Sequence, residues 1–246
     1  SRERVLHQNS DASGYGLNAA SRARKIATIR SFYKYLTNKV HLIKENPVKD
    51  LDSPKLKKTL PKYLTLEESV QLLSSVDGQN RERDYCILTL FLNCGLRISE
   101  LCALNTTDIQ DDALRVLGKG NKVRIVYLND ACKEALSGYL AMRRPIVGRD
   151  QNALFLSSRN ERVSRSTVHA LVKKHLSEAG LDSTQYSAHK LRHTAATLML
   201  QNGVDVKAVQ EVLGHEHLNT TEIYTHIDNE ALRVAAKANP LSGVKM

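Results

Sequence analysis

The sequence predicts a mostly α-helical protein with a small antiparallel β-sheet, preceded by a short helical segment. Three observations support this fold class. Apolar residues recur at helical spacing before and after one β-rich stretch. That stretch consists of two β-rich runs around a glycine-containing turn. Prolines interrupt the chain before the main helical region begins. We therefore expect a front helical segment over residues 1–55, a linker over residues 56–63 and a main α+β domain over residues 64–246.

The front segment is expected to contain one basic amphipathic helix over Ala19–Lys39. Its apolar side carries Ile26, Ile29, Phe32, Tyr33 and Leu36, and its polar side carries Arg24, Arg30 and Lys34. Residues 1–62 contain 14 Lys/Arg against 5 Asp/Glu, so the net charge of +10 lies almost entirely at the front. This asymmetry favours a polyanionic partner such as nucleic acid, with solubility alone as the alternative.

A proline-punctuated stretch follows this helix. The segment "ENPVKDLDSPKLKKTLPKYLT" holds Pro47, Pro54 and Pro61 together with five lysines, a composition typical of an interdomain linker. One or two helices cannot bury a core alone. The front segment is therefore either a tiny domain or one cut short at its N-terminus, and we expect the second.

The main domain is expected to open with a capped helix and to continue through a buried one. Thr65 and Glu68 form a capping-box pattern, "RDYCILTLFLNCG" predicts a central buried helix that ends near Gly95, and "LRISELCAL" predicts a short helix. In "ALRVLGKGNKVRIVYL" two β-rich runs flank residues 118–122, which predicts a β-hairpin. Helical patterns then return in "SRSTVHALVKKHLSEAG", "SAHKLRHTAATLMLQNG", "DVKAVQEVLGH" and "TTEIYTH".

The tail, "NEALRVAAKANPLSGVKM", predicts a short helix stopped before Pro240. Leu232, Ala235 and Ala236 fall on one face of it. Such a helix is too short to be stable alone, so it must dock, either on its own domain or on another subunit.

Several classes of protein are not expected. The chain has no run of about 18 apolar residues, and its start, "SRERVLHQNSDASGYG", lacks the apolar stretch of a signal peptide. We therefore expect a soluble, cytoplasmic protein with no membrane partner. No Cys-x-x-Cys pair occurs among Cys86, Cys94, Cys102 and Cys132, so we expect neither disulfides nor structural zinc.

The segment "HKLRHTAATLML" combines an apolar stripe with a cationic face. Leu191, Ala195, Leu198 and Met199 form the stripe, and His189, Arg192 and His193 point another way. Two histidines four residues apart can bind zinc, but the chain has Lys190 where a metalloprotease motif has glutamate, and Arg192 would repel a cation. The functional interpretation is a set of donors aimed at an anion. A solvated helix face is the alternative.

Two further motifs point to anion chemistry less specifically. Arg97 follows the glycine that ends the apolar helix, and Glu100 lies one turn further on, where it can orient the arginine. A surface ion pair is the alternative. "GKGNK" lacks the full phosphate-loop pattern, so it is a hairpin tip that either presents a lysine to phosphate or leaves it solvated.

Taken in order, these motifs resemble the tyrosine recombinase/integrase family, and most of all the Xer-type recombinases of bacteria. The resemblance rests on "GLRISEL", "GKGNK", "HKLRHT" and "LGHEHLNTTEIYTH", the last with a tyrosine nine residues after its first histidine, and it covers about residues 15–240. It implies a mostly α catalytic domain with a small sheet, over residues 64–246. The front segment would then be part of a helical core-binding domain that clamps DNA, and the family's version of that domain is longer.

The resemblance assigns catalytic roles to Arg97, Lys119, His189, Arg192, His215 and Tyr224. Tyr224 would attack the phosphate, with His189 as base, because a tyrosine hydroxyl with a pKa near 10 is a weak nucleophile unaided. The two arginines and His215 would hold the phosphate oxygens, and Lys119, with Lys122 as fallback, would protonate the leaving oxygen. Glu100 and His193 would support these groups. No metal, ATP or other cofactor is expected.

Both parts of the chain would contact DNA. Candidate contacts are Arg22, Arg24, Lys25 and Arg30 in the front helix, and Arg165, Lys173 and Lys174 in the helix after "SRS". Each of these side chains can equally be solvated.

The resemblance implies a site-specific DNA recombinase that works through a 3′-phosphotyrosine intermediate. It would act on a double-stranded recombination site as a homo- or hetero-tetramer on two duplexes, with each tail docked on a neighbouring subunit. Chromosome partition and mobile-element integration both use such an activity. The alternatives are nicking and resealing in the manner of a type IB topoisomerase, and a catalytically idle DNA-binding regulator.

Overall fold

The computed structural model describes residues 17–55, 62–118, 120, 122–143, 150–214 and 229–244. The chain divides between Pro61 and Lys62 into two compact units. This division falls within the predicted linker of residues 56–63, of which residues 56–61 lie outside the described part.

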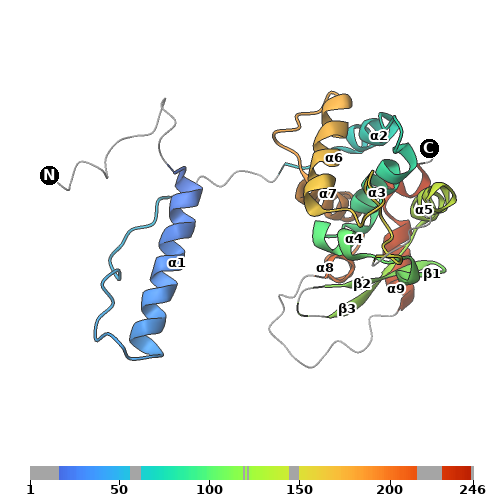
Figure 1. The fold of residues 1–246 in the computed structure, drawn as a ribbon. Helices are drawn as coiled ribbons and strands as arrows, with labels where there is room; N and C mark the ends of the chain where they lie inside the picture. The colour runs from blue at the N-terminus through green and yellow to red at the C-terminus, as the bar shows by residue number, and fades with distance from the viewer. Residues whose placement is uncertain are drawn as a thin grey trace. The chain divides into compact units, whose positions relative to one another are not determined.

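The front unit contains one long helix, α1 (Ala19–Asn38), which confirms the helix predicted there (Figure 1). None of its residues is buried, and Phe32 is 56% exposed. Arg30 donates hydrogen bonds to the hydroxyl of Ser53 at 3.3 Å and to the carbonyl of Leu51, so the chain folds back along the helix. The described part of this unit therefore has a helix and a return segment but no closed core.

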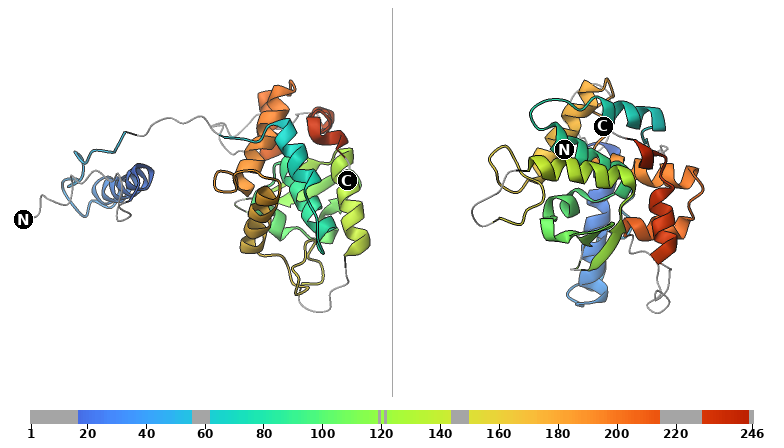
Figure 2. Two further views of the ribbon diagram at one scale, coloured as in Figure 1. Left: turned by 90° about the horizontal axis from the view of Figure 1, so that it is seen from above. Right: turned by 90° about the vertical axis from the view of Figure 1, so that its right-hand side faces the viewer.

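The main unit is mostly helical with one small sheet, as predicted (Figures 1 and 2). Its elements are α2 (Leu66–Ser74), α3 (Arg81–Cys94), α4 (Ile98–Ala103), η2 (Thr106–Asp108), β1 (Ile109–Gln110), β2 (Ala113–Leu117), β3 (Val123–Tyr127), α5 (Asp130–Met142), α6 (Arg165–Glu178), α7 (Ala188–Gln201), α8 (Val206–Leu213), α9 (Asn229–Lys237) and η4 (Pro240–Gly243). Four of these, η2, β1, α5 and η4, lie where no element was predicted from the sequence. The predicted helix in "TTEIYTH" lies outside the described residues.

Local signals explain where several elements begin and end. Thr65 and Glu68 form the predicted capping box, with the Glu68 N–H donating to Thr65 Oγ1 at 3.1 Å and the Thr65 N–H to Glu68 Oε2 at 2.8 Å. The predicted hairpin is an antiparallel pair of β2 and β3, and β1 adds an antiparallel strand next to β2. The sheet lies at one end of the unit, with α4 packed on β2 and α9 packed on β3 (Figure 1).

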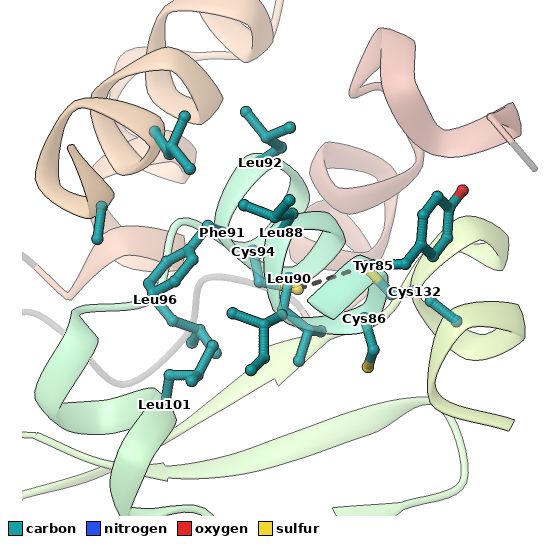
Figure 3. Packing of buried hydrophobic residues seen from close by; sticks show 14 of the residues in the cluster. Tyr85, Cys86, Leu88, Leu90, Phe91, Leu92, Cys94, Leu96, Leu101 and Cys132 are labelled. Carbon is teal, nitrogen blue, oxygen red and sulfur yellow. Dashed lines mark hydrogen bonds between the residues drawn. The ribbon is translucent and has the colours of Figure 1, made fainter. Parts of the chain in front are cut away.

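The core is organised around α3. Every residue from Asp84 to Cys94 is buried, and α3 packs mainly on α5 and α7. Figure 3 shows Leu88, Leu92 and Phe91 spreading from this helix toward its neighbours. Because burial of each such side chain is worth roughly 1.5–3 kcal/mol, this helix fixes the position of the turn that follows it.

A smaller apolar cluster holds the tail. Leu232 and Ala235 of α9 pack with residues of α7 and α8, and Asn239 donates to the carbonyl of Leu92 in α3 at 3.0 Å. The tail helix and its stop before Pro240 are as predicted. In this single chain the helix packs on its own domain, where α7 and α8 supply its apolar cover. Docking on a neighbouring subunit stays a prediction.

No helix in the described part of the chain combines the length and the apolar character needed to cross a membrane.

Candidate active site

The turn between α3 and α4 places Arg97 at the start of α4. Gly95 ends α3 at φ 58°, a left-handed conformation that glycine adopts without strain. A Cβ at this position would lie 2.4 Å from Cδ2 of Leu213, so the close approach of α8 also requires glycine. Arg97 is then the N-cap residue of α4, in an extended conformation.

One buried carboxylate, that of Glu100, connects two arginines. Its side chain is 3% exposed. It accepts from Arg97 through the backbone N–H at 2.8 Å and through Nη1 at 2.8 Å. It also accepts from Arg124, through Nη1 at 2.8 Å and Nη2 at 2.9 Å. Arg97 and Glu100 therefore form the pair that their spacing predicts, with a second arginine added.

This arrangement keeps Glu100 ionised. Burial by itself raises the pKa of the Glu100 carboxyl, but the hydrogen bonds and charge of Arg124, followed by the hydrogen bonds from Arg97, outweigh it and lower the pKa to about 2. Glu100 is thus an anchor for cations at neutral pH and not a proton donor.

Arg192 lies inside the unit and not on the polar face of α7 that the sequence analysis assigned to it. Its side chain is 5% exposed, and Nη1 donates to the carbonyl of Gly95 at 2.5 Å. The position on α7 faces the end of α3, so the guanidinium is held by buried backbone carbonyls. Burial, followed by the charge of Arg97, lowers the pKa of Arg192 to about 10. The side chain remains a cation at neutral pH.

The C-terminal end of α8 is held by three arginines. Each donates to one of three consecutive carbonyls: Arg124 Nε to Val212 at 3.3 Å, Arg192 Nη2 to Leu213 at 2.6 Å and Arg97 Nη2 to Gly214 at 2.9 Å. Cations stabilise a helix C-terminus because its free carbonyls carry partial negative charge. The arginines therefore fix the point from which the chain continues into residues 215–228, a segment outside the described part.

The exposure of the arginines sets the direction from which an anion can approach. The Arg97 side chain is 37% exposed, against 16% for Arg124 and 5% for Arg192. An anion from solvent therefore meets Arg97 first, with two further cations close behind it.

Comparison with known proteins decides the family. A sequence model of the phage integrase family matches residues 62–231. This chain belongs to the phage integrase family. It is 56% identical over 223 residues to tyrosine recombinase XerC of Caldanaerobacter subterraneus subsp. tengcongensis, a match that covers 90% of this chain and 63% of the relative. It is 39% identical over 237 residues to XerC of Thermodesulfovibrio yellowstonii, covering 92% of this chain and 78% of that one. The resemblance to Xer-type tyrosine recombinases is confirmed.

Solved structures of two recombinases share the fold. The XerA recombinase matches at 32% identity with a TM-score of 0.59, covering 87% of this chain and 74% of that one. The XerH site-specific recombinase bound to palindromic difH substrate, in a post-cleavage complex, matches at 26% identity with a TM-score of 0.70, covering 90% and 67%. The chain spans 63% of the XerC relative from Caldanaerobacter, so it matches part of a longer protein.

The two histidines of α7 differ in their exposure. His189 lies exposed in the first turn of α7, and His193 is half-buried. The His193 ring packs edge-on against Tyr63, with ring centroids 6.4 Å apart. Burial, followed by the charges of Lys190 and His189, lowers the pKa of His193. His193 is thus favoured in its neutral form, as a packing partner for the chain entering the main unit.

Three of the residues assigned from the family resemblance, Lys119, His215 and Tyr224, lie outside the described residues. The structure brings together Arg97, Arg192 and Glu100 from the same set. In the described ranges, no three His, Cys, Asp or Glu side chains come together as a metal site requires.

The candidate DNA-contacting side chains differ in whether they are exposed to solvent or bonded within the protein. Exposed side chains are those of Arg22, Arg24 and Lys25 on α1, and Arg165 and Lys174 on α6, the last of these 3.6 Å from Glu178. Two candidates are instead engaged with the protein itself: Arg30 with Leu51 and Ser53, and Lys173 with the carbonyls of Ser183 and Tyr186. These two side chains make hydrogen bonds within the protein, and contact of either with DNA stays a prediction.

Arg124 was not among the functional residues predicted from the sequence. A signal for it exists: in β3 every second residue faces the same side, and Val126, two residues on, is 2% exposed. Strand alternation therefore places Arg124 on the inward face, where an arginine needs a buried partner. Glu100 is that partner.

Proposed function

We propose that this protein is a site-specific DNA recombinase that cuts and rejoins DNA strands through a 3′-phosphotyrosine intermediate, without metal or ATP. The observation that carries the proposal is that Arg97 and Arg192 converge on the ionised Glu100 carboxylate. Both arginines also hold the end of α8, from which the chain continues into the segment that contains Tyr224. Membership of a family whose relatives are called tyrosine recombinases supports it, as does the likeness to a recombinase bound to its DNA substrate.

In the proposed cleavage step, the Tyr224 oxygen forms a bond to phosphorus while the bond from phosphorus to the 5′ oxygen breaks. The hydroxyl proton of Tyr224 passes to His189, and Lys119 gives a proton to the leaving 5′ oxygen. Rejoining is the reverse, with a 5′ hydroxyl as nucleophile. One phosphate ester is exchanged for another of similar energy, so no ATP is consumed.

The arginines supply the positive charge that this step needs. Negative charge builds on the two non-bridging phosphate oxygens during attack, and donors placed there are each worth about 2–4 kcal/mol. Arg97 offers a partly exposed guanidinium. Arg192 acts from a buried position, where its charge is less screened by water. His215 is proposed as a third donor, so cationic side chains take the place of a divalent metal.

Partners and location are part of the same proposal. Phosphates of the duplex would be contacted by exposed side chains of α1 (Arg22, Arg24 and Lys25) and of α6 (Arg165 and Lys174). Four subunits, of this chain or of two related chains, would assemble on two duplexes in the cytoplasm. The front unit would be part of a core-binding domain over residues 1–55, joined by residues 56–63 to a catalytic domain over residues 64–246.

Strand exchange between two labelled duplexes is the experiment that tests this function. A recombination site is first recovered by sequencing the DNA that the purified protein retains from a random pool. We expect joined products that carry label from both duplexes. Nicking and resealing without exchange would instead favour a type IB topoisomerase-like activity, and binding with neither would favour a regulator.

A further inference from the structure

Arg124 makes contacts that no assigned role explains. It lies on β3 with a side chain only 16% exposed, and its guanidinium holds both oxygens of Glu100, at 2.8 and 2.9 Å. Such a two-bond fork fixes the plane of a carboxylate and not only its position. Glu100 uses the remaining capacity of the same oxygens to hold the backbone N–H and Nη1 of Arg97.

The opposite edge of Arg124 touches the end of α8. Nε donates to the carbonyl of Val212 at 3.3 Å. Gly214 lies at φ 64°, and a Cβ on it would come within 3.0 to 3.2 Å of Cδ, Nε and Cζ of Arg124. The guanidinium thus packs directly on the glycine that ends α8, whose carbonyl accepts from Arg97 at 2.9 Å. Arg124 reaches Arg97 by two routes, one through Glu100 and one through α8.

We propose that Arg124 is a positioning residue for the proposed strand cleavage: it fixes the Glu100 carboxylate and the end of α8, and these two in turn aim the guanidinium of Arg97 at the phosphate. This inference rests on the proposed function. Arg124 acts through other residues, because its three assigned N–H bonds all end on protein atoms and its side chain is less than half as exposed as that of Arg97.

Removing Arg124 would change Glu100 in a defined way. The hydrogen bonds and the charge of Arg124 are the largest of the influences that lower the pKa of Glu100, against the effect of burial. Without them the pKa rises, and a protonated Glu100 is a poorer acceptor for Arg97. The loss should therefore be greatest at low pH, and it should depend on Glu100 being present.

The test compares Arg124→Gln, Arg124→Lys and the control Arg115→Gln in the full chain. Arg115 is a matched control because it lies on the adjacent strand, opposite Ile125, with its side chain 52% exposed. Single-turnover formation of the covalent adduct is measured on a nicked half-site substrate as a function of pH, with half-site affinity and melting temperature for each variant. The same series is repeated in a Glu100→Gln background.

We expect Arg124→Gln to slow adduct formation by roughly tenfold to a hundredfold, the effect of losing charge-assisted hydrogen bonds, with little change in half-site affinity. The ratio of variant to unaltered rate should fall further as the pH drops. Arg124→Lys should be intermediate, because an ammonium cannot hold both oxygens in a fork, and it keeps the test open if the glutamine variant does not fold. In the Glu100→Gln background the Arg124 substitution should cost much less.

A rate for Arg124→Gln equal to that of Arg115→Gln would overturn the inference. The inference would also be wrong if the rate effects of the Arg124 and Glu100 substitutions simply multiplied in the double variant. It would be wrong as well if the loss of half-site affinity accounted for the whole loss of rate. A readout without DNA separates this inference from the proposed function: carboxyl NMR titration of Glu100. The pKa of Glu100 should rise in Arg124→Gln from its low value in the unaltered protein, whether or not either protein cleaves. An unchanged titration would exclude the positioning role, whereas a shifted titration with no adduct from the unaltered protein would count against the recombinase function alone.

Discussion

Replacing Glu100 with glutamine should remove a pH-dependent part of the folding stability. The pKa of this carboxyl falls from 4.5 to about 2 on folding, and one pKa unit corresponds to about 1.36 kcal/mol. The ionised carboxylate therefore contributes about 3 kcal/mol to the free energy of unfolding. Because the pKa is lowered on folding, this contribution is fully present above pH 4.5 and is lost as the pH falls toward 2.

Urea unfolding of the unaltered protein and of Glu100→Gln measures this contribution. The difference in unfolding free energy should be at least about 3 kcal/mol near pH 7 and should shrink by roughly half near pH 3. Glu161→Gln is the control, because Glu161 is exposed and its loss should matter by less than about 0.5 kcal/mol. If the Glu100→Gln difference were the same at both pH values, the carboxylate would not be held ionised by its arginines.

Three further predictions concern Arg97, the need for metal and Gly95. Arg97→Ala should slow cleavage by roughly a hundredfold to a thousandfold with little loss of half-site affinity; an affinity loss as large as the rate loss would make Arg97 a DNA anchor only. Cleavage should persist in EDTA, and a loss of cleavage that Mg²⁺ restores would contradict a mechanism based on cationic side chains. Gly95→Ala should lower the unfolding free energy by more than about 2 kcal/mol, from backbone strain plus the contact with Leu213. Gly203→Ala, at φ 84° with no atom within 4 Å of the added Cβ, should show the strain alone, and equal effects for both glycines would contradict the packing contribution.

Local patterns were enough to predict most helices and one pair of side chains. The apolar run in "RDYCILTLFLNCG" predicted α3, because a buried helix is apolar on all sides. Gly95 marked its end, because glycine adopts the left-handed conformation of a helix end without strain. The spacing of Arg97 and Glu100 predicted their contact because residues three apart lie on one side of a helical turn.

Contacts between distant segments were not predictable from the same patterns. Arg192 was expected on a polar face, yet it is buried because the carbonyls of Gly95 and Leu213 lie where its guanidinium reaches. Those acceptors become available only when α3, α7 and α8 pack together. The short strand β1 also depends on its neighbour, since two residues carry no alternation of their own. Arg124 is an intermediate case: strand alternation places it inward, but nothing local names Glu100 as its partner.

The measurement that tests the proposed chemistry most directly is covalent trapping on a nicked suicide substrate. In such a DNA the short fragment that leaves with a free 5′ hydroxyl diffuses away after cleavage, so the protein remains attached to the other fragment through the 3′ phosphate. We expect the unaltered protein to form this adduct, with the DNA mapped by peptide mass spectrometry to Tyr224, and Tyr224→Phe to bind the same half-site with nearly unchanged affinity but form no adduct. An adduct that survives in Tyr224→Phe, or one that maps to another of the nine tyrosines, would contradict the assignment of Tyr224 as the nucleophile.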